Sequence, residues 1–153
     1  MRQPPAPTPQ KNAQILLVDD NRQGLVARRS LLQELGYSVS TASSGDEALE
    51  LFSPQKFDVV VADYKMPRMN GVELIRRIRE MDGAVHIILL SGFVEPLGLT
   101  EETTGADIVI AKSAGEVGQL TRAVKRLLSH PPARKPAASA NAPLRAKAQA
   151  KRG

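Results

Sequence analysis

The chain has 153 residues, no cysteine, two histidines and a formal net charge of +5. The length suits one domain, and the composition excludes a disulfide framework, a thiolate metal site and a histidine-built metal cluster. No apolar run approaches the ~20 residues that span a bilayer, and the first residues lack the apolar core of a secretion signal. We therefore expect no membrane insertion and a cytoplasmic location.

The positive charge lies outside the central part of the chain. Residues 1–13 and 131–153 together hold eight Lys and Arg residues and no acid, so residues 14–130 carry 13 basic and 16 acidic side chains, a net charge of −3. The outer segments, one rich in Pro and the other in Ala, Pro, Lys and Arg, have too few apolar residues to offset the entropy cost of folding. We predict a disordered Pro-rich tail over 1–13, one domain over 14–130 and a disordered basic tail over 131–153.

Short apolar runs alternate with amphipathic stretches through the predicted domain. Four runs are almost continuously apolar, as are strands of a parallel sheet that is covered on both faces. A fifth run alternates apolar and polar residues, which suits an edge strand. In chain order the predicted strands are residues 15–18, 37–42 (the alternating run), 59–62, 87–90 and 108–111.

Helical patterns lie between these strands. They cover residues 21–35, 46–52, 72–81 and 115–128. The first of them stops at Gly36, a residue type favoured where a helix ends in a left-handed turn. Residues 94–105 should supply a further helix, but Pro96, Gly98 and three threonines favour a short or irregular one. This order predicts an α/β fold, a doubly wound five-stranded parallel sheet with right-handed crossovers.

Reactive side chains follow the predicted strands at their carboxyl ends, where the working site of an open parallel sheet lies. Asp19 and Asp20 follow the first strand, Asp63 the third, Ser91 the fourth and Lys112 the fifth. In the strand order 2-1-3-4-5 these residues meet. Crowded carboxylates need a compensating cation, and Mg²⁺ is a hard ion that prefers oxygen ligands. A carboxylate in such a site can attack phosphorus to form an acyl phosphate, while the metal and a lysine neutralise the phosphoryl oxygens.

Each of these residues also has a simpler explanation when taken alone. Asp19 and Asp20 precede a predicted helix and could cap it. Asp63 could be a turn residue, Ser91 could end a strand, and Lys112 could be a solvated charge. The joint pattern favours the chemical interpretation, because these residue types follow successive strands in one chain.

The sequence resembles the receiver domain of bacterial response regulators, of which the chemotaxis response regulator is the simplest member, over roughly residues 14–130. The matching stretches are Ile-Leu-Leu-Val-Asp-Asp-Asn at 15–21, Asp-Val-Val-Val-Ala-Asp-Tyr-Lys-Met-Pro-Arg-Met-Asn-Gly at 58–71, Leu-Ser-Gly at 90–92, and Gly-Ala-Asp at 105–107 running to Lys112. The resemblance implies a flavodoxin-like receiver fold in which Asp63 is the phosphoacceptor, Ser91 the switch hydroxyl and Lys112 the phosphoryl-contacting lysine.

The same resemblance implies Mg²⁺ as the cofactor. Its ligands would be Asp20, Asp63 and the backbone carbonyl of Lys65, with Asp19 acting mainly through water. Two positions depart from the family pattern. Ser113 follows the lysine where proline is usual, and Val109 stands where receivers usually carry Tyr or Phe. The ring rotation that commonly reports phosphorylation in this family is therefore in doubt here.

The function implied is that of a single-domain response regulator, because the residues after 128 are too few and too polar to form an output domain. It would accept a phosphoryl group from a histidine kinase or phosphotransfer protein, then signal by contact with a downstream protein or act as a phosphate sink. We expect no enzymatic activity beyond Mg²⁺-dependent self-phosphorylation and autodephosphorylation. The alternative is an adaptor of the same fold that works without phosphorylation, which the loss of an acidic or acceptor residue would indicate; none is lost.

Two further functions fit the sequence less well. A haloacid-dehalogenase-type phosphatase also uses an aspartyl nucleophile, but it needs a second Asp two residues later, where this chain has Lys65. The basic tails could contact nucleic acid, yet without aromatic residues or a folded reader such contacts would be non-specific and salt-sensitive. We therefore do not expect nucleic acid to be the partner.

Overall fold

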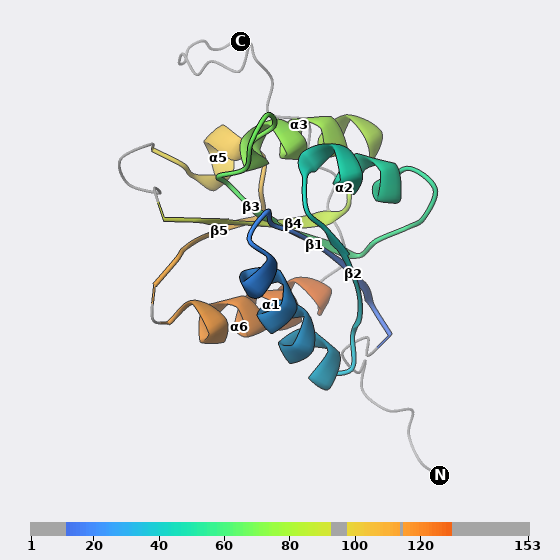
Figure 1. The fold of residues 1–153 in the computed structure, drawn as a ribbon, viewed down its shortest axis with the longest axis vertical. Helices are drawn as coiled ribbons and strands as arrows, with labels where there is room; N and C mark the ends of the chain where they lie inside the picture. The colour runs from blue at the N-terminus through green and yellow to red at the C-terminus, as the bar shows by residue number, and fades with distance from the viewer. Residues whose placement is uncertain (1–11, 93–97, 114, 130–153) are drawn as a thin grey trace.

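Five parallel strands form one sheet in the order β2-β1-β3-β4-β5 in the computed structural model of the chain, which describes residues 12–92, 98–113 and 115–129 (Figure 1). The strands are β1 (Gln14–Val18), β2 (Ser38–Ala42), β3 (Val59–Asp63), β4 (His86–Ser91) and β5 (Ile108–Ala111). The predicted strand order is confirmed. The alternating run, β2, lies at an edge of the sheet, as expected for a strand with one partner.

Helices cover both faces of the sheet. They are α1 (Arg22–Glu34), α2 (Gly45–Phe52), α3 (Gly71–Met81), α5 (Glu101–Thr104) and α6 (Glu116–Leu128). Figure 1 shows α1 and α6 on one face and α2, α3 and α5 on the other. The predicted doubly wound architecture is therefore confirmed.

The two layers of core follow from the alternation of side chains along each strand. Leu16 and Val60 are fully buried in the core layer that includes Phe52 of α2. Their neighbours Leu17 and Val61 are buried in the other layer, with residues of α1 and α6. Because both faces are covered, the central strands are apolar throughout, and their polar side chains are confined to the ends.

Two asparagines fix where the helices beside the carboxyl edge begin. The Oδ1 of Asn21 accepts a hydrogen bond of 3.0 Å from the Gly24 amide at the start of α1. The Oδ1 of Asn70 accepts one of 2.9 Å from the Glu73 amide at the start of α3. An N-cap of this kind satisfies one of the free amides of the first helical turn. The caps therefore belong to asparagines, and neither Asp19 nor Asp20 has this role.

The segment between β4 and β5 holds a single helical turn in its described part. This turn, α5, is closed at its start by a capping box between Thr100 and Thr103. It ends at Gly105, whose φ of 84° lies in the left-handed region that glycine adopts readily. The expectation of a short helix holds for residues 98–105, while residues 93–97 lie outside the described residues.

The predicted tails fall almost wholly outside the described residues. Only Asn12 and Ala13 of the segment 1–13 are described, and the segment 131–153 is not. Ala13 is buried, and its carbonyl accepts a hydrogen bond of 2.9 Å from the Ser38 amide. Among the described helices, none combines the length and the apolar character that a membrane span requires.

Candidate functional site

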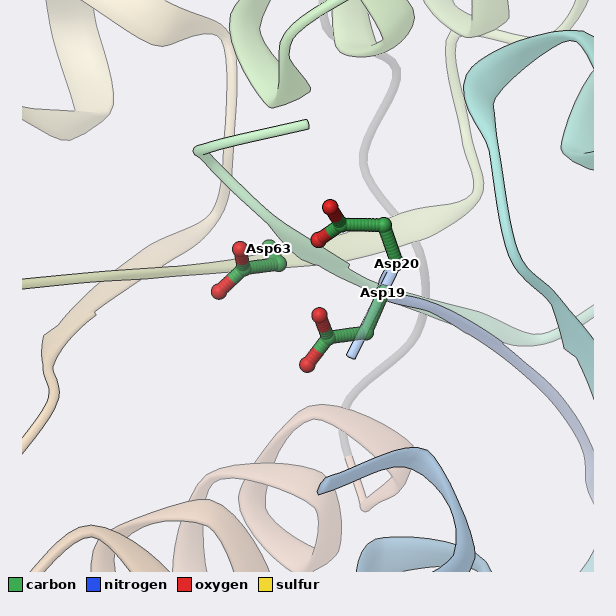
Figure 2. A group of neighbouring side chains, drawn as sticks. All are labelled: Asp19, Asp20 and Asp63. Carbon is green, nitrogen blue, oxygen red and sulfur yellow. The ribbon is translucent and has the colours of Figure 1, made fainter. Parts of the chain in front are cut away.

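Three carboxylates meet at the carboxyl ends of the neighbouring strands β1 and β3 (Figure 2). Asp63 is the last residue of β3, and Asp19 and Asp20 directly follow β1. One oxygen of each lies within 4.8 Å of the others. Asp19 and Asp63 are 3% and 4% exposed, whereas Asp20 is open to solvent. The parallel pairing of two apolar strands thus brings two buried acids and one exposed acid together.

A cavity of about 560 Å³ lies over these carboxylates. It contains every site residue predicted from the sequence; its lining is Asp19, Asp20, Asn21, Asp63, Lys65, Met66, Pro67, Ser91, Gly92 and Lys112. Ser91 is the last residue of β4 and is 2% exposed, and Lys65 is exposed in the loop after β3. The structure therefore brings together residues from the ends of four strands.

Lys112 pairs with the buried carboxylate. Its ammonium forms an ion pair with Oδ1 of Asp63, and its backbone amide donates a hydrogen bond of 2.9 Å to the carbonyl of Ser91. Burial raises the pKa of Asp63 above its ordinary value; Lys112 and Arg28 oppose this rise, and the Asp19 carboxylate adds to it. Asp63 is therefore a partly desolvated carboxylate with one fixed cation beside it.

The loop after β3 is held close against the site. The amide of Gly71 donates a hydrogen bond of 2.8 Å to the carbonyl of Tyr64. A Cβ at Gly71 would lie 2.5 Å from the carbonyl oxygen of Asp63, so only glycine fits there. The Asn-Gly pair at 70–71 thus has two structural tasks: the asparagine caps α3, and the glycine allows the helix to start against the end of β3.

The contacts of Asp19 include a residue that sequence reasoning missed. Its Oδ1 accepts a hydrogen bond of 2.9 Å from the Asn21 amide, and its Oδ2 pairs with the guanidinium of Arg28 at 2.7 Å. Arg28 also contacts Glu116, through Nε and Nη2 at 2.8 Å each. Burial alone would lower the pKa of Arg28, but its bonds with Glu116 and Asp19 outweigh this effect and raise the pKa.

A signal for Arg28 is present in the sequence. Leu25 and Leu32 form the buried stripe of α1, and Arg28 lies three residues after the first and four before the second. Residues at this spacing share one face of a helix. A charged residue on an apolar face needs a buried partner, so its position in the stripe is the available indication.

The oxygen donors of this site suit a hard divalent cation. Three carboxylates face two cationic side chains, Arg28 and Lys112, which leaves one negative charge at the cluster. Mg²⁺ binds through one or two carboxylates and keeps several waters, and the cavity offers both the carboxylate oxygens and the space. The residues present therefore fit such an ion.

Residues 15–125 match the family model described as the response regulator receiver domain. The chain belongs to the response regulator receiver domain family. The match covers nearly the whole sheet and most of α6. It confirms the resemblance expected from the Asp-Asp pair, the loop after Asp63 and the final lysine.

Two curated relatives show how this receiver is related to longer proteins. The virulence sensor protein BvgS of Bordetella bronchiseptica is 45% identical over 76 residues, which cover 50% of this chain and 6% of that protein. The alkaline phosphatase synthesis transcriptional regulatory protein PhoP of Bacillus subtilis is 33% identical over 121 residues, 75% of this chain and 49% of that protein. The chain thus spans at most about half the length of these relatives.

Solved receiver structures share the fold. The response regulator TrrA from Thermotoga maritima, solved in complex with Mg²⁺ and BeF, has a TM-score of 0.68 and 33% identity, covering 75% of this chain and 98% of that chain. The chemotaxis response regulator CheY4 of Vibrio cholerae has a TM-score of 0.69 and 29% identity, covering 76% of this chain and 98% of that chain. Both are similar to this receiver through nearly all of their length.

Proposed function

We propose that this receiver domain accepts a phosphoryl group on Asp63 in a reaction that depends on Mg²⁺. The observation that supports this most directly is the position of Asp63. Its carboxylate is buried at the end of β3, lines the cavity, pairs with Lys112 and lies among two further carboxylates. A single acid with this environment is suited to be the nucleophile, and the others are suited to hold a cation.

The transfer is a displacement at phosphorus. One carboxylate oxygen of Asp63 forms a bond to phosphorus as the bond from phosphorus to the donor breaks, and the donor's leaving group departs with that electron pair. Such a reaction needs positioning and charge neutralisation more than covalent chemistry from other residues. Lys112 would neutralise one phosphoryl oxygen, and Ser91 would donate a hydrogen bond to another.

Asp20, Asp63 and the backbone carbonyl of Lys65 would hold the ion directly, and Asp19 would act through water. When bound, Mg²⁺ supplies positive charge that neutralises the phosphoryl oxygens. The contacts of Asp19 support its indirect role, because its Oδ1 already accepts from the Asn21 amide and its Oδ2 already pairs with Arg28. The solvent exposure of Asp20 supports its direct role.

The phosphodonor in this proposal is a histidine kinase or a phosphotransfer protein in the cytoplasm. The chain would act as a single-domain response regulator that signals through a downstream protein or serves as a phosphate sink. Its chemistry would be limited to Mg²⁺-dependent phosphorylation and dephosphorylation of its own aspartate. The similar receiver TrrA was solved in complex with Mg²⁺ and BeF, which supports the choice of metal.

Intact mass measurement after incubation with Mg²⁺ and a small phosphodonor such as acetyl phosphate tests this proposal. We expect one phosphoryl group on the wild-type protein and none on Asp63→Asn. The matched control is Asp46→Asn, an exposed acid in the first turn of α2, which should be phosphorylated like the wild type. Equal phosphorylation of Asp63→Asn would contradict the proposed acceptor, and a wild-type protein that gains no phosphoryl group would favour the adaptor.

A further inference from the structure

Arg28 joins the acidic site to the start of α6. Its side chain is 12% exposed and lies between two carboxylates, Asp19 beside the cavity and Glu116 in the first turn of α6. The guanidinium uses Nη1 for the first and Nε with Nη2 for the second. Three short charged contacts on one largely buried arginine fix its position.

These contacts change the charge seen by an incoming cation. Within the described residues, Asp63 has Lys112 as an ion-pair partner, Asp19 has Arg28, and Asp20 has no ion-pair partner. The two buried carboxylates are thus each neutralised before any metal arrives. A divalent cation that approaches Asp20 and Asp63 meets a fixed positive charge 2.7 Å from the third carboxylate.

We propose that Arg28 is a built-in counter-ion of the acidic site, which positions Asp19 and weakens the binding of a divalent cation there. This inference rests on the metal site of the proposed function. Arg28 competes with the ion in two ways: its charge repels the ion, and its hydrogen bond occupies Oδ2 of Asp19, the oxygen that would otherwise be free to accept from metal-bound water.

Glu116 controls the strength of this competition. Because it shares the guanidinium with Asp19, it draws part of the positive charge away from the acidic site. Lys112 and Glu116 also lie at the two ends of the short connection from β5 to α6. Both ends of that connection are therefore tied to the carboxylate cluster, one through Asp63 and the other through Arg28.

The test is isothermal titration of the full chain with Mg²⁺ alone, without a phosphodonor. Arg28→Gln removes the charge, and we expect it to bind Mg²⁺ roughly three- to tenfold more tightly than the wild type. Arg28→Lys keeps the charge and should stay closer to the wild type than Arg28→Gln. The matched control is Arg29→Gln, an exposed neighbour on α1, which should change the affinity by less than about twofold.

A double-mutant cycle tests the part played by Glu116. Glu116→Gln leaves Arg28 with Asp19 as its single carboxylate partner of the two, so we expect weaker Mg²⁺ binding than in the wild type. In the Arg28→Gln background the same change should have less effect, because Glu116 acts through Arg28. A role of Arg28 confined to fold stability would not produce this sign reversal between the two single variants.

The outcomes separate this inference from the proposed function. Unchanged or weaker Mg²⁺ binding by a folded Arg28→Gln variant, with normal binding by the wild type, overturns the inference alone. If Arg28→Gln does not fold, Glu116→Gln decides: weaker binding supports the inference, and unchanged binding overturns it. A wild-type protein that binds no Mg²⁺ contradicts the metal site itself, and with it both proposals.

Discussion

The ammonium of Lys112, which follows β5, forms an ion pair with Oδ1 of Asp63, the last residue of β3, across the end of the intervening strand β4. The backbone of Lys112 is fixed to that same strand by its hydrogen bond to the Ser91 carbonyl. This pairing favours the ionised form of a buried carboxylate beside two other acids. It also places a cation where a phosphoryl group on Asp63 would carry its negative charge.

Binding of Mg²⁺ should stabilise the fold, because an ion that binds the native cluster and not the unfolded chain shifts the folding equilibrium. At a concentration about tenfold above the dissociation constant, we expect a gain of about 1.4 kcal/mol. Thermal melts with and without Mg²⁺ measure it. Asp20→Asn should lose most of the shift, whereas the control Asp46→Asn should keep it; an equal shift in Asp20→Asn would place the ion elsewhere.

Arg79 is expected to be a main determinant of stability at the opposite end of the sheet. Its buried guanidinium donates to the carbonyls of Gly83, Val85 and Gly105 and pairs with Asp107 at 3.0 Å. Arg79→Met leaves these acceptors buried without a donor, which should lower the free energy of unfolding by about 3–5 kcal/mol in urea melts. The same change at the exposed Arg77 of α3 should cost less than about 1 kcal/mol.

The close approach of α3 to the site makes Gly71 sensitive to a single methyl group. Gly71→Ala would place a Cβ against the carbonyl of Asp63, so the loop after β3 must move. We expect a loss of about 1–3 kcal/mol in stability and slower phosphorylation by acetyl phosphate. Gly118→Ala, inside α6, meets only the flexible end of Arg122 and should leave both nearly unchanged or raise stability slightly. Equal tolerance at both glycines would show that this loop does not position the site.

Much of the site can be predicted because it depends on strand ends. A continuous apolar run fixes a buried strand, and the residue after it must lie at the carboxyl edge, so Asp63, Ser91 and Lys112 follow from counting along the chain. The strand boundaries differ by one residue in places, since Ser91 is inside β4 and Asp63 inside β3. The helix caps are less certain in sequence, where Asp19, Asp20 and Asn21 are consecutive candidates; the geometry selects Asn21.

The contacts of Arg28 and Arg79 could not be predicted in the same way. Arg28 meets Glu116 88 positions later in the chain, and that encounter depends on the rotation of two helices packed side by side on one face. Arg79 bonds to three backbone carbonyls, which carry no signal in the residue types. Asp107 of the Gly-Ala-Asp stretch accepts from Arg79 and from the Ile87 amide, which gives that part of the family pattern a structural reason.

Switching should involve the segment between β4 and β5. Valine at position 109 has no ring to rotate, and the four-residue helix α5 is too short to be stable by itself. We therefore predict that this segment orders when Ser91 and Lys112 engage a phosphoryl group. Hydrogen exchange with and without Mg²⁺ and beryllofluoride measures this. Residues 98–105 should exchange fast in the free protein and more slowly with the mimic; protection that is already high, or indifferent to the mimic, would refute this switch.

The central claim is that Asp63 carries the phosphoryl group, and borohydride reduction of the phosphorylated protein tests it most directly. Borohydride reduces an aspartyl phosphate to homoserine, which peptide sequencing by mass spectrometry can locate. After treatment with acetyl phosphate and Mg²⁺, we predict homoserine at position 63 in the peptide that contains the end of β3, and unmodified aspartate at Asp19 and Asp20. Homoserine at either of those two positions, with Asp63 intact, would contradict the account.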